Sequence, residues 1–339
     1  MDFLAGDVGG TKTLLGIFSW DKGLIKMHQK KYSSSDWDSI EPILSNFINN
    51  LPHEIAAPTK ACLAVAGPVT NGQSKLTNLG WELDRDEIIK STCLESVELI
   101  NDICVLIYSI PFLNSHQITR LQIGKNKEKS NNQVAVIASG TGLGIARGVI
   151  SKNNILALPS EGGHKEFAAR NETEWELSQW LKSDLNIKRL SIEQVISGNG
   201  LGNIARWRLS QPDAVNHPLR NIIKVWRDKG NQKHDFPNLV SETANKGDQL
   251  MQDVLEIWLG AYGSAAGDLA LQELCEGGLW IAGGTAAKQL KGLSSSSFIE
   301  PMKNKGRFCQ YLDQIPVTAM IDQEVGLIGA ACKARMLAE

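Results

Sequence analysis

A glycine turn between apolar runs occurs twice in this chain, and it limits the possible folds more than any other feature. The first turn, Asp7-Val8-Gly9-Gly10-Thr11-Lys12, lies between apolar runs at residues 3–5 and 14–18. The second, Ser139-Gly140-Thr141-Gly142-Leu143-Gly144, follows the apolar run at residues 134–138. Paired glycines between two such runs are typical of a β-hairpin. The sequence therefore predicts two strand-turn-strand units far apart in the chain.

Both turns have the chemistry of a phosphate-binding site. Glycines let the backbone approach a ligand closely, so the N–H groups of Gly9, Gly10 and Thr11 can donate to phosphate oxygens, with the Lys12 ammonium nearby. Asp7, at the end of the first strand, is placed to hold a hydrated Mg²⁺. The alternative is an ordinary hairpin in which Asp7 only supports the turn.

The second turn is predicted to bind phosphate through Gly140, Thr141 and Gly142. It is not a dinucleotide fingerprint, because the glycines of that motif open a helix. It also lacks the Gly-Lys-Ser/Thr ending of a P-loop. Two separated turns of this kind predict a nucleotide held between two lobes.

Length and charge agree with a two-lobed enzyme that acts on small molecules. A chain of 339 residues exceeds the size at which one hydrophobic core keeps growing, so we expect two domains. The formal net charge of −2 provides no basic field for nucleic acid or an anionic membrane. No apolar run is long enough to span a bilayer. The six cysteines show no CxxC spacing, which argues against a zinc site and for a reducing, cytoplasmic compartment.

A carboxylate follows a predicted strand at the position where open α/β sheets bind ligands. The apolar run at residues 97–100 is followed by Asn101-Asp102, and residues 103–110 are predicted to be helical. An aspartate between a strand and a helix can also be a helix N-cap without any chemical role. Phosphoryl transfer to an alcohol, however, needs a carboxylate that orients the hydroxyl and accepts its proton. Asp102 is therefore the candidate general base.

Two further segments carry polar groups beside glycines. Glu161 and His164 flank the pair Gly162-Gly163, an arrangement that suits sugar hydroxyls. His164 could also be a loop residue with no ligand, and zinc is disfavoured because no cysteine or histidine follows nearby. Glu193 precedes a predicted glycine turn at residues 198–200, and by itself it would be interpreted as a solvated helix residue.

Local signals also predict helices. Asp84 is a favoured N-cap for a helix over residues 85–92. A second helix is expected over residues 248–274, where small residues on neighbouring turns allow close packing. An apolar helix over residues 325–337 is expected to return to the N-terminal lobe. The expected domains are residues 1–111 plus about 316–339, which form a small α/β domain, and residues 112–315, which form a large α/β domain.

Six motifs occur in the order seen in bacterial-type glucokinase, and the chain resembles that family rather than the zinc-containing repressor/kinase type. They are Asp7-Val8-Gly9-Gly10-Thr11, Ile100-Asn101-Asp102, Gly140-Thr141-Gly142-Leu143-Gly144, Glu161-Gly162-Gly163-His164, Ser197-Gly198-Asn199-Gly200-Leu201 and Ile281-Ala282-Gly283-Gly284. The resemblance implies a two-lobed α/β fold of the actin/hexokinase type (ribonuclease H-like) with a central ligand cleft. It also implies a cytoplasmic glycolytic enzyme that phosphorylates D-glucose at the 6-hydroxyl with ATP and Mg²⁺, and gives glucose 6-phosphate and ADP.

By the same resemblance, Asp102 would be the base, and Gly283-Gly284 would lie beside the adenosine. The sugar hydroxyls would be bound by Asn78, Asn101, Glu161, His164 and Glu193. The alternatives are a kinase for another hexose and a catalytically inactive sugar-sensing protein of the same fold. We expect a homodimer, because cyclic dimers are the commonest assemblies.

Overall fold

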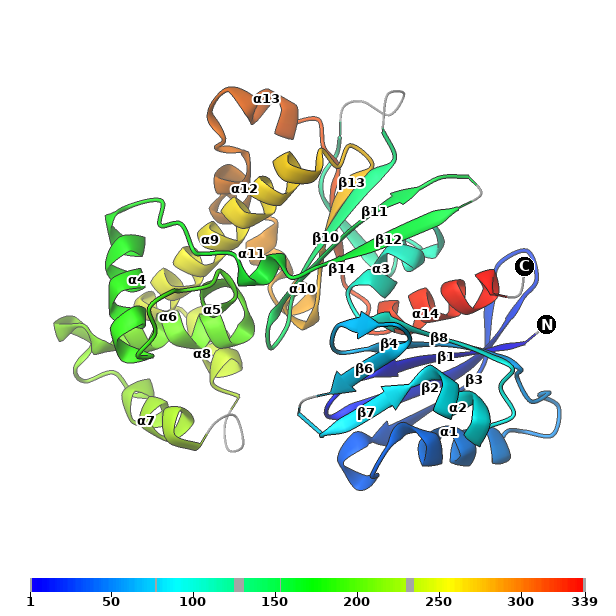
Figure 1. Ribbon diagram of the computed structural model, residues 1–339. Coiled ribbons are helices and arrows are strands. Elements are labelled where there is room, and N and C mark those ends of the chain that lie inside the picture. Colours follow the sequence, from blue (N-terminus) through cyan, green and yellow to red (C-terminus); the bar gives the residue numbers. More distant parts are fainter. Residues whose placement is uncertain (1, 77, 125–130, 153, 230–234, 338–339) are drawn as a thin grey trace. The chain divides into compact units, whose positions relative to one another are not determined.

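The computed structural model describes residues 2–76, 78–124, 131–152, 154–229 and 235–337 (Figure 1). The chain divides into two compact units. Unit 1 contains Met1–Ile118, Ala146–Pro159 and Asp322–Glu339, and unit 2 contains Thr119–Ile145 and Ser160–Ile321. The sequence pattern places the domain boundaries near residues 111 and 315, whereas the compact units divide after residues 118 and 321 and assign residues 146–159 to unit 1.

Unit 1 is built on a five-stranded sheet in the order β3-β2-β1-β4-β8. Its strands are β1 (Phe3–Val8), β2 (Lys12–Trp20), β3 (Leu24–Ser33), β4 (Lys60–Val65) and β8 (Ser96–Asn101). β1 and β2 are antiparallel and are joined by residues 9–11, which confirms the first predicted hairpin. β4 and β8 run parallel to β1, with Val8 opposite Val65 and Val65 opposite Asn101. The residues that follow β1 and β8 therefore leave the sheet at the same edge.

Helices cover both faces of this sheet. α14 (Val325–Met336) packs on β1 and β4, as expected for the C-terminal helix, and α1 (Ile40–Asn49) and α2 (Arg85–Ser91) lie on the other face (Figure 1). α3 (Cys104–Ser109) follows β8 and packs against α14. The buried side chains of α1 and α2 join those of β1, β2, β4 and β8 in one hydrophobic core.

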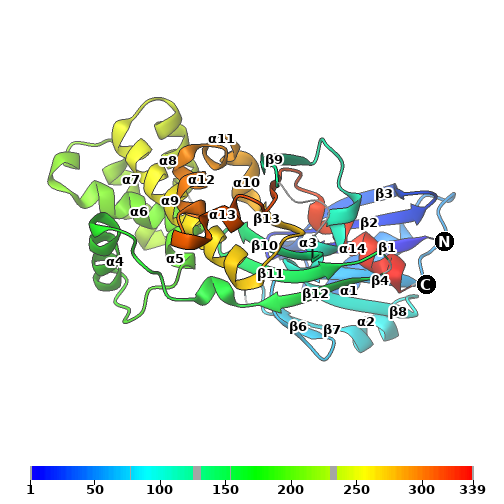
Figure 2. The same cartoon turned by 90° about the horizontal axis from the view of Figure 1, so that it is seen from above.

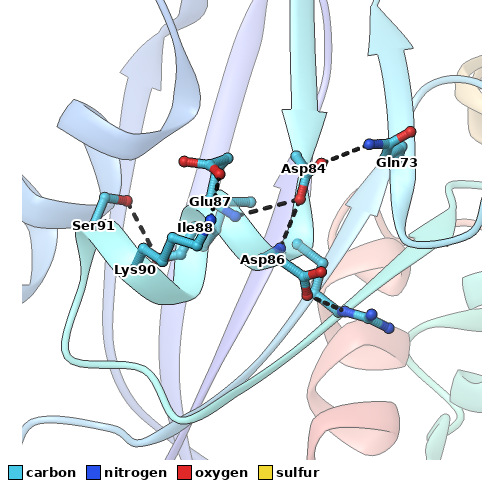
Figure 3. Close-up of polar contacts among 8 residues, drawn as sticks. Gln73, Asp84, Asp86, Glu87, Ile88, Lys90 and Ser91 are labelled. Atoms are coloured by element: carbon cyan, nitrogen blue, oxygen red, sulfur yellow. Dashed lines mark hydrogen bonds and ion pairs between the residues drawn. The ribbon is translucent and has the colours of Figure 1, made fainter.

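The predicted cap of α2 is confirmed. One carboxylate oxygen of Asp84 accepts hydrogen bonds from the backbone N–H groups of Asp86 at 2.8 Å and Glu87 at 3.3 Å (Figure 3). The Gln73 side chain donates to the other oxygen. Gln73 lies in a small antiparallel sheet formed by β5 (Val69–Thr70), β6 (Gln73–Leu76) and β7 (Trp81–Asp84). Asp84 therefore connects this small sheet to the start of α2.

The second large sheet has the strand order β12-β11-β10-β13-β14-β9. The strands are β9 (Ile118–Gln122), β10 (Gln133–Ser139), β11 (Leu143–Ile150), β12 (Ile155–Ser160), β13 (Gly278–Ala282) and β14 (Val317–Met320). Residues 140–142 connect β10 to β11, as the second predicted hairpin requires. β13 is parallel to β10, with Ala282 opposite Ala138, so the glycine turns that follow these two strands start side by side.

Unit 2 is rich in helices, which Figure 2 shows from a second direction. The longest is α9 (Gln249–Glu273), which confirms the helix predicted over residues 248–274, and Asp248 caps it. A Cβ atom at Gly263 or Gly267 would lie 2.1 Å from a backbone carbonyl oxygen of α12 (Ser296–Lys303), so these glycines allow the close contact predicted from the small residues. The other helices are α4 (Glu172–Asp184), α5 (Glu193–Ile196), α6 (Gly198–Ser210), α7 (Leu219–Lys229), α8 (Phe236–Asn245), α10 (Gly284–Lys288), α11 (Leu290–Leu293) and α13 (Cys309–Leu312).

One local prediction is wrong. Residues 198–200 were expected to form a glycine turn, but they are the first turn of α6. The Ser197 hydroxyl caps this helix by accepting a hydrogen bond from the N–H group of Gly200 at 3.0 Å. A good N-cap at Ser197 outweighs the weak helix propensity of the two glycines. In the part of the chain that the structure describes, none of the helices has the length and apolar character needed to cross a bilayer.

Candidate active site

The first glycine turn is held by hydrogen bonds within unit 1. The Gly9 N–H group donates to the Lys12 carbonyl oxygen at 3.0 Å, so this amide is used inside the turn. Among the described residues, the N–H groups of Gly10 and Thr11 have no such partner and can donate to a ligand. The Ser34 hydroxyl donates to the Gly9 carbonyl oxygen at 2.8 Å, and the Ser34 N–H group donates to Thr11. Ser34 is buried and supports the turn, a role that no sequence pattern indicated.

Asp7 lies directly before this turn, on β1. Burial raises the pKa of its carboxyl, while the Lys12 ammonium acts in the opposite direction. A Cβ atom at Gly326, near the start of α14, would lie 3.4 Å from Asp7 Oδ2, so the glycine leaves room beside this carboxylate. A partly desolvated carboxylate with space beside it suits a divalent cation, because a cation offsets the cost of burying the charge.

Asn101 and Asp102 lie at the same sheet edge as the first turn. The Asp102 N–H group donates to the Val65 carbonyl oxygen at 2.9 Å. Val65 also pairs with Val8, so one strand separates the end of β1 from the end of β8, and the two ends are about 10 Å apart. The first turn and Asp102 thus share one edge of the unit 1 sheet.

Asp102 is not the N-cap of α3. The cap is formed by Asn101, whose Oδ1 accepts hydrogen bonds from the N–H groups of Ile103 at 3.0 Å and Cys104 at 3.1 Å. Asn101 Nδ2 donates to Asp102 Oδ1 and to the Gly67 carbonyl oxygen, each at 3.1 Å. Asn101 therefore provides hydrogen bonds at the start of α3 of the kind that was considered for Asp102.

Asn78 is an exposed residue between β6 and β7. A Cβ atom at Gly10 would lie 3.4 Å from Asn78 Cβ and 3.7 Å from Nδ2. Unit 1 therefore brings Asn78 next to the first glycine turn, at the edge that also holds Asp102.

In unit 2 the second glycine turn is joined to Glu193. The Leu143 N–H group donates to Glu193 Oε2 at 2.9 Å, and a Cβ atom at Gly142 would lie 2.6 Å from the same oxygen. Gly140 is tied in as well, since its N–H group donates to the Gly142 carbonyl oxygen. Glu193 is therefore not a solvated helix residue, because its carboxylate lies against the turn.

The Gly283-Gly284 turn packs on the end of β10. Gly283 has φ 89° and ψ 171°, and a Cβ atom there would lie 2.3 Å from the Ser139 carbonyl oxygen. The Thr285 hydroxyl donates to that same oxygen at 2.9 Å. Because Ser139 directly precedes the second turn, the two glycine segments of unit 2 are neighbours.

Glu161 and His164 lie beside the start of β11. Glu161 precedes the 3-10 turn Gly162–His164, and His164 is its last residue. The backbone at Gly163 is so close to Leu143 that a Cβ atom there would lie 2.0 Å from the Leu143 carbonyl oxygen. His164 Nε2 is 3.9 Å from Glu161 Oε2, and both side chains are more than half exposed. The Gly162–His164 segment and the Glu193 carboxylate therefore both lie beside Leu143, directly after the Gly140–Gly142 turn.

Each unit thus assembles half of the predicted site residues. Unit 1 holds Asp7, Gly9, Gly10, Thr11, Lys12, Asn78, Asn101 and Asp102, and unit 2 holds Gly140, Thr141, Gly142, Glu161, His164, Glu193, Gly283 and Gly284. Across the described ranges, no three His, Cys, Asp or Glu side chains gather closely enough to hold a metal ion among themselves.

Comparison with known proteins identifies relatives of the whole chain. A family model described as Glucokinase matches residues 4–337. The glucokinase of Nostoc punctiforme is 38% identical over 341 residues, which cover 98% of this chain and 99% of the relative. A crystal structure of glucokinase from an Antarctic psychrotroph is 30% identical, has a TM-score of 0.82 and is matched over 99% of both chains. The fold is also similar to that of a ROK family glucokinase from Streptomyces griseus in complex with glucose and AMPPNP, with a TM-score of 0.63, 19% identity and coverage of 99% of this chain and 100% of that one.

Proposed function

The chain belongs to the glucokinase family, and from that premise we propose that it transfers the γ-phosphoryl group of ATP to the 6-hydroxyl of glucose with Asp102 as general base. The observation that carries this proposal is the position of Asp102. It follows β8 at the sheet edge where residues 9–11 follow β1. A carboxylate near a phosphate-binding turn can accept a hydroxyl proton as the phosphoryl group is transferred.

The phosphate oxygens would be bound by backbone amides and by Lys12. In unit 1 the free N–H groups of Gly10 and Thr11 support this assignment. In unit 2 the supporting features are the Gly140-Thr141-Gly142 turn and the adjacent Gly283-Gly284 turn, which would lie beside the adenosine. Amides that are already oriented before the reaction stabilise transferring charge without reorganisation.

Hydrogen-bonding side chains would bind the sugar hydroxyls. Glu161, His164 and Glu193 gather in unit 2, and Asn78 lies at the unit 1 edge. Asn101 has weaker support as a direct ligand, because its amide hydrogens and its carbonyl oxygen already bind protein groups. A site built from hydrogen-bonding groups rejects analogues that lack a hydroxyl.

Asp7 would hold Mg²⁺ through water. Its carboxyl is partly desolvated and has a glycine beside it, which fits a hydrated cation. When bound, Mg²⁺ neutralises charge on the phosphates. The charge of Lys12, at the start of β2, lowers the pKa of the same carboxyl, and Lys12 would bind the phosphates.

The Asp102→Asn variant tests the base. We expect turnover to fall by about 10²- to 10⁴-fold with ATP binding retained, since the amide cannot accept the proton. Asp84→Asn is the matched control, because asparagine also caps helices well and Asp84 lies at the start of α2. Near-normal turnover of a folded Asp102→Asn enzyme would refute the assignment.

A coupled assay of ADP formation with glucose, mannose, fructose and N-acetylglucosamine tests the substrate. We expect the highest kcat/KM with glucose. A higher value with another hexose would favour the alternative sugar kinase, and no turnover with any of the four would favour the inactive sugar-sensing protein.

We also propose a cytoplasmic, homodimeric glycolytic enzyme. All six cysteines are free thiols, which supports a reducing compartment. The proposal of a dimer is based on the prevalence of cyclic dimers, and analytical ultracentrifugation would show whether the protein is a monomer instead.

Limited proteolysis would test the proposed domain boundaries near residues 111 and 315.

A further inference from the structure

The side chain of Asn101 has a complete set of hydrogen bonds inside unit 1. A primary amide has two N–H donors and a carbonyl oxygen that accepts two hydrogen bonds. Oδ1 accepts from the N–H groups of Ile103 and Cys104, and Nδ2 donates to Asp102 Oδ1 and the Gly67 carbonyl oxygen. Each of the four distances lies between 3.0 and 3.1 Å. The amide thus joins the segment after β4, the end of β8 and the start of α3.

The chemistry of the neighbours fixes the orientation of this amide. Backbone N–H groups can only donate, and backbone carbonyl and carboxylate oxygens can accept. A flipped amide would direct Nδ2 at the two N–H groups and Oδ1 at the two oxygens, which would replace four attractions with four repulsions. An N–H group therefore faces the carboxylate of Asp102.

We infer that Asn101 is a positioning residue for Asp102, which fixes the carboxylate in the orientation that receives the proton. The inference rests on the proposed function of Asp102. The backbone N–H group of Asp102 donates to the Val65 carbonyl oxygen, and the Asn101 amide donates to the side-chain carboxylate and so restrains its orientation. An N–H donor to a carboxylate also favours the charged form, which is the form that acts as a base.

Two substitutions separate this role from simple helix capping. Asn101→Asp keeps an oxygen that can cap α3 but replaces the N–H donor with a second acceptor facing Asp102. Asn101→Ser also keeps a capping oxygen and removes the amide donors without adding charge. Asn171→Asp is the matched control: Asn171 caps α4 by accepting from the Glu174 N–H group at 2.9 Å, and the proposed site does not include it.

The measurements are kcat, the KM values for glucose and ATP, and the pH dependence of kcat, with a thermal melt to confirm folding. We expect kcat to fall about 100-fold in Asn101→Asp and at least about 10-fold in Asn101→Ser, because small errors in the position of a catalytic group are costly. The acidic limb of the kcat profile should move to higher pH in both, and further in Asn101→Asp. Asn171→Asp should match the wild type in all of these.

The acidic limb reports the Asp102 carboxyl if no neighbouring group titrates with it. The described contacts place the Cys104 thiol of α3 beside Asp102, and burial raises the pKa of that thiol to about 12, with a smaller contribution from the Asp102 charge. It therefore stays neutral throughout the acidic limb. The Asn101 amide that donates to the carboxylate does not titrate.

A rise in the glucose KM alone, with kcat and the acidic limb unchanged, would show that Asn101 is only a sugar ligand and would overturn the inference. If Asn101→Asp does not fold, Asn101→Ser decides by the same criteria. An active Asp102→Asn enzyme would instead refute the proposed base, so the two failures are distinguishable.

Discussion

Replacing Gly283 with alanine tests whether the turn after β13 requires glycine for both its conformation and its space. Gly283 has φ 89° and ψ 171°, a region that residues with a side chain adopt at a cost of about 1–3 kcal/mol. The new Cβ atom would lie 2.3 Å from the oxygen, 2.7 Å from the carbon and 2.8 Å from the nitrogen of the Ser139 backbone. Ser139 cannot easily move, because it ends a central strand and its buried hydroxyl donates to the Ile196 carbonyl oxygen at 3.0 Å.

Overpacking of this kind costs about 1–3 kcal/mol, and the smaller conformational freedom of the unfolded alanine chain returns about 0.4–1 kcal/mol. The net loss of unfolding free energy is therefore about 1–5.5 kcal/mol, which lowers the melting temperature by roughly 2–22 °C for a domain of this size. A thermal melt followed by circular dichroism measures this loss.

Gly284 is the matched control, since it is the next residue in the same turn. No atom lies within 4 Å of a Cβ atom at Gly284, and this residue begins α10. Alanine is favoured over glycine inside a helix by about 1 kcal/mol, so Gly284→Ala should melt at or slightly above the wild-type temperature. If the two variants melt at the same temperature, the argument from backbone conformation and close contact is refuted.

Two further outcomes are expected. Gly142→Ala should melt within a few degrees of the wild type, because the new Cβ atom meets only the end of the flexible Glu193 side chain, at 2.6 Å. Displacement of the Glu193 carboxylate should nevertheless raise the KM for glucose. An unchanged KM would contradict the role of Glu193. Asp84→Ala should be less stable than the wild type at neutral pH. Hydrogen bonds from Gln73 and from the Asp86 and Glu87 N–H groups lower the pKa of Asp84 below its ordinary value of 3.8. The ionised carboxylate therefore stabilises the folded protein above pH 3.8, and this stabilisation is lost as the pH falls through the lower pKa of the folded state. Urea titrations at pH 7 and at about pH 2.5 should show the difference between the two proteins shrinking, and a constant difference would count against the carboxylate.

Local features of the sequence correctly predicted the elements that depend on near neighbours. Both glycine hairpins, the Asp84 cap and the helix that begins after Asp248 are confirmed, because each is determined by residues a few positions apart. The first turn of α6 was missed, although Ser197 was a visible capping residue, because paired glycines suggested a turn instead. Residues 207–246 contain the end of α6 and the helices α7 and α8, while residues 230–234 lie outside the described residues.

The candidate site was predicted as a set of residues without their contacts. The resemblance to a known family supplied the roles proposed for the sugar ligands, and the structure showed which of these residues lie together in each unit. The contact of Glu193 with Leu143 and the support of the first turn by Ser34 join residues that are 50 and 25 positions apart. No periodicity or motif could reveal them.

The sequence by itself determined where strands, turns and caps occur, since glycine, aspartate and alternating apolar residues act over a few positions. Tertiary structure decided which strand ends share an edge and what each polar side chain contacts. Asn101 shows the difference: the sequence places it between a strand and a helix, but only the pairing of β8 with β4 brings the Gly67 carbonyl within reach of its amide. That pairing is set by the packing of the whole sheet, and it determines what the Asn101 side chain contacts.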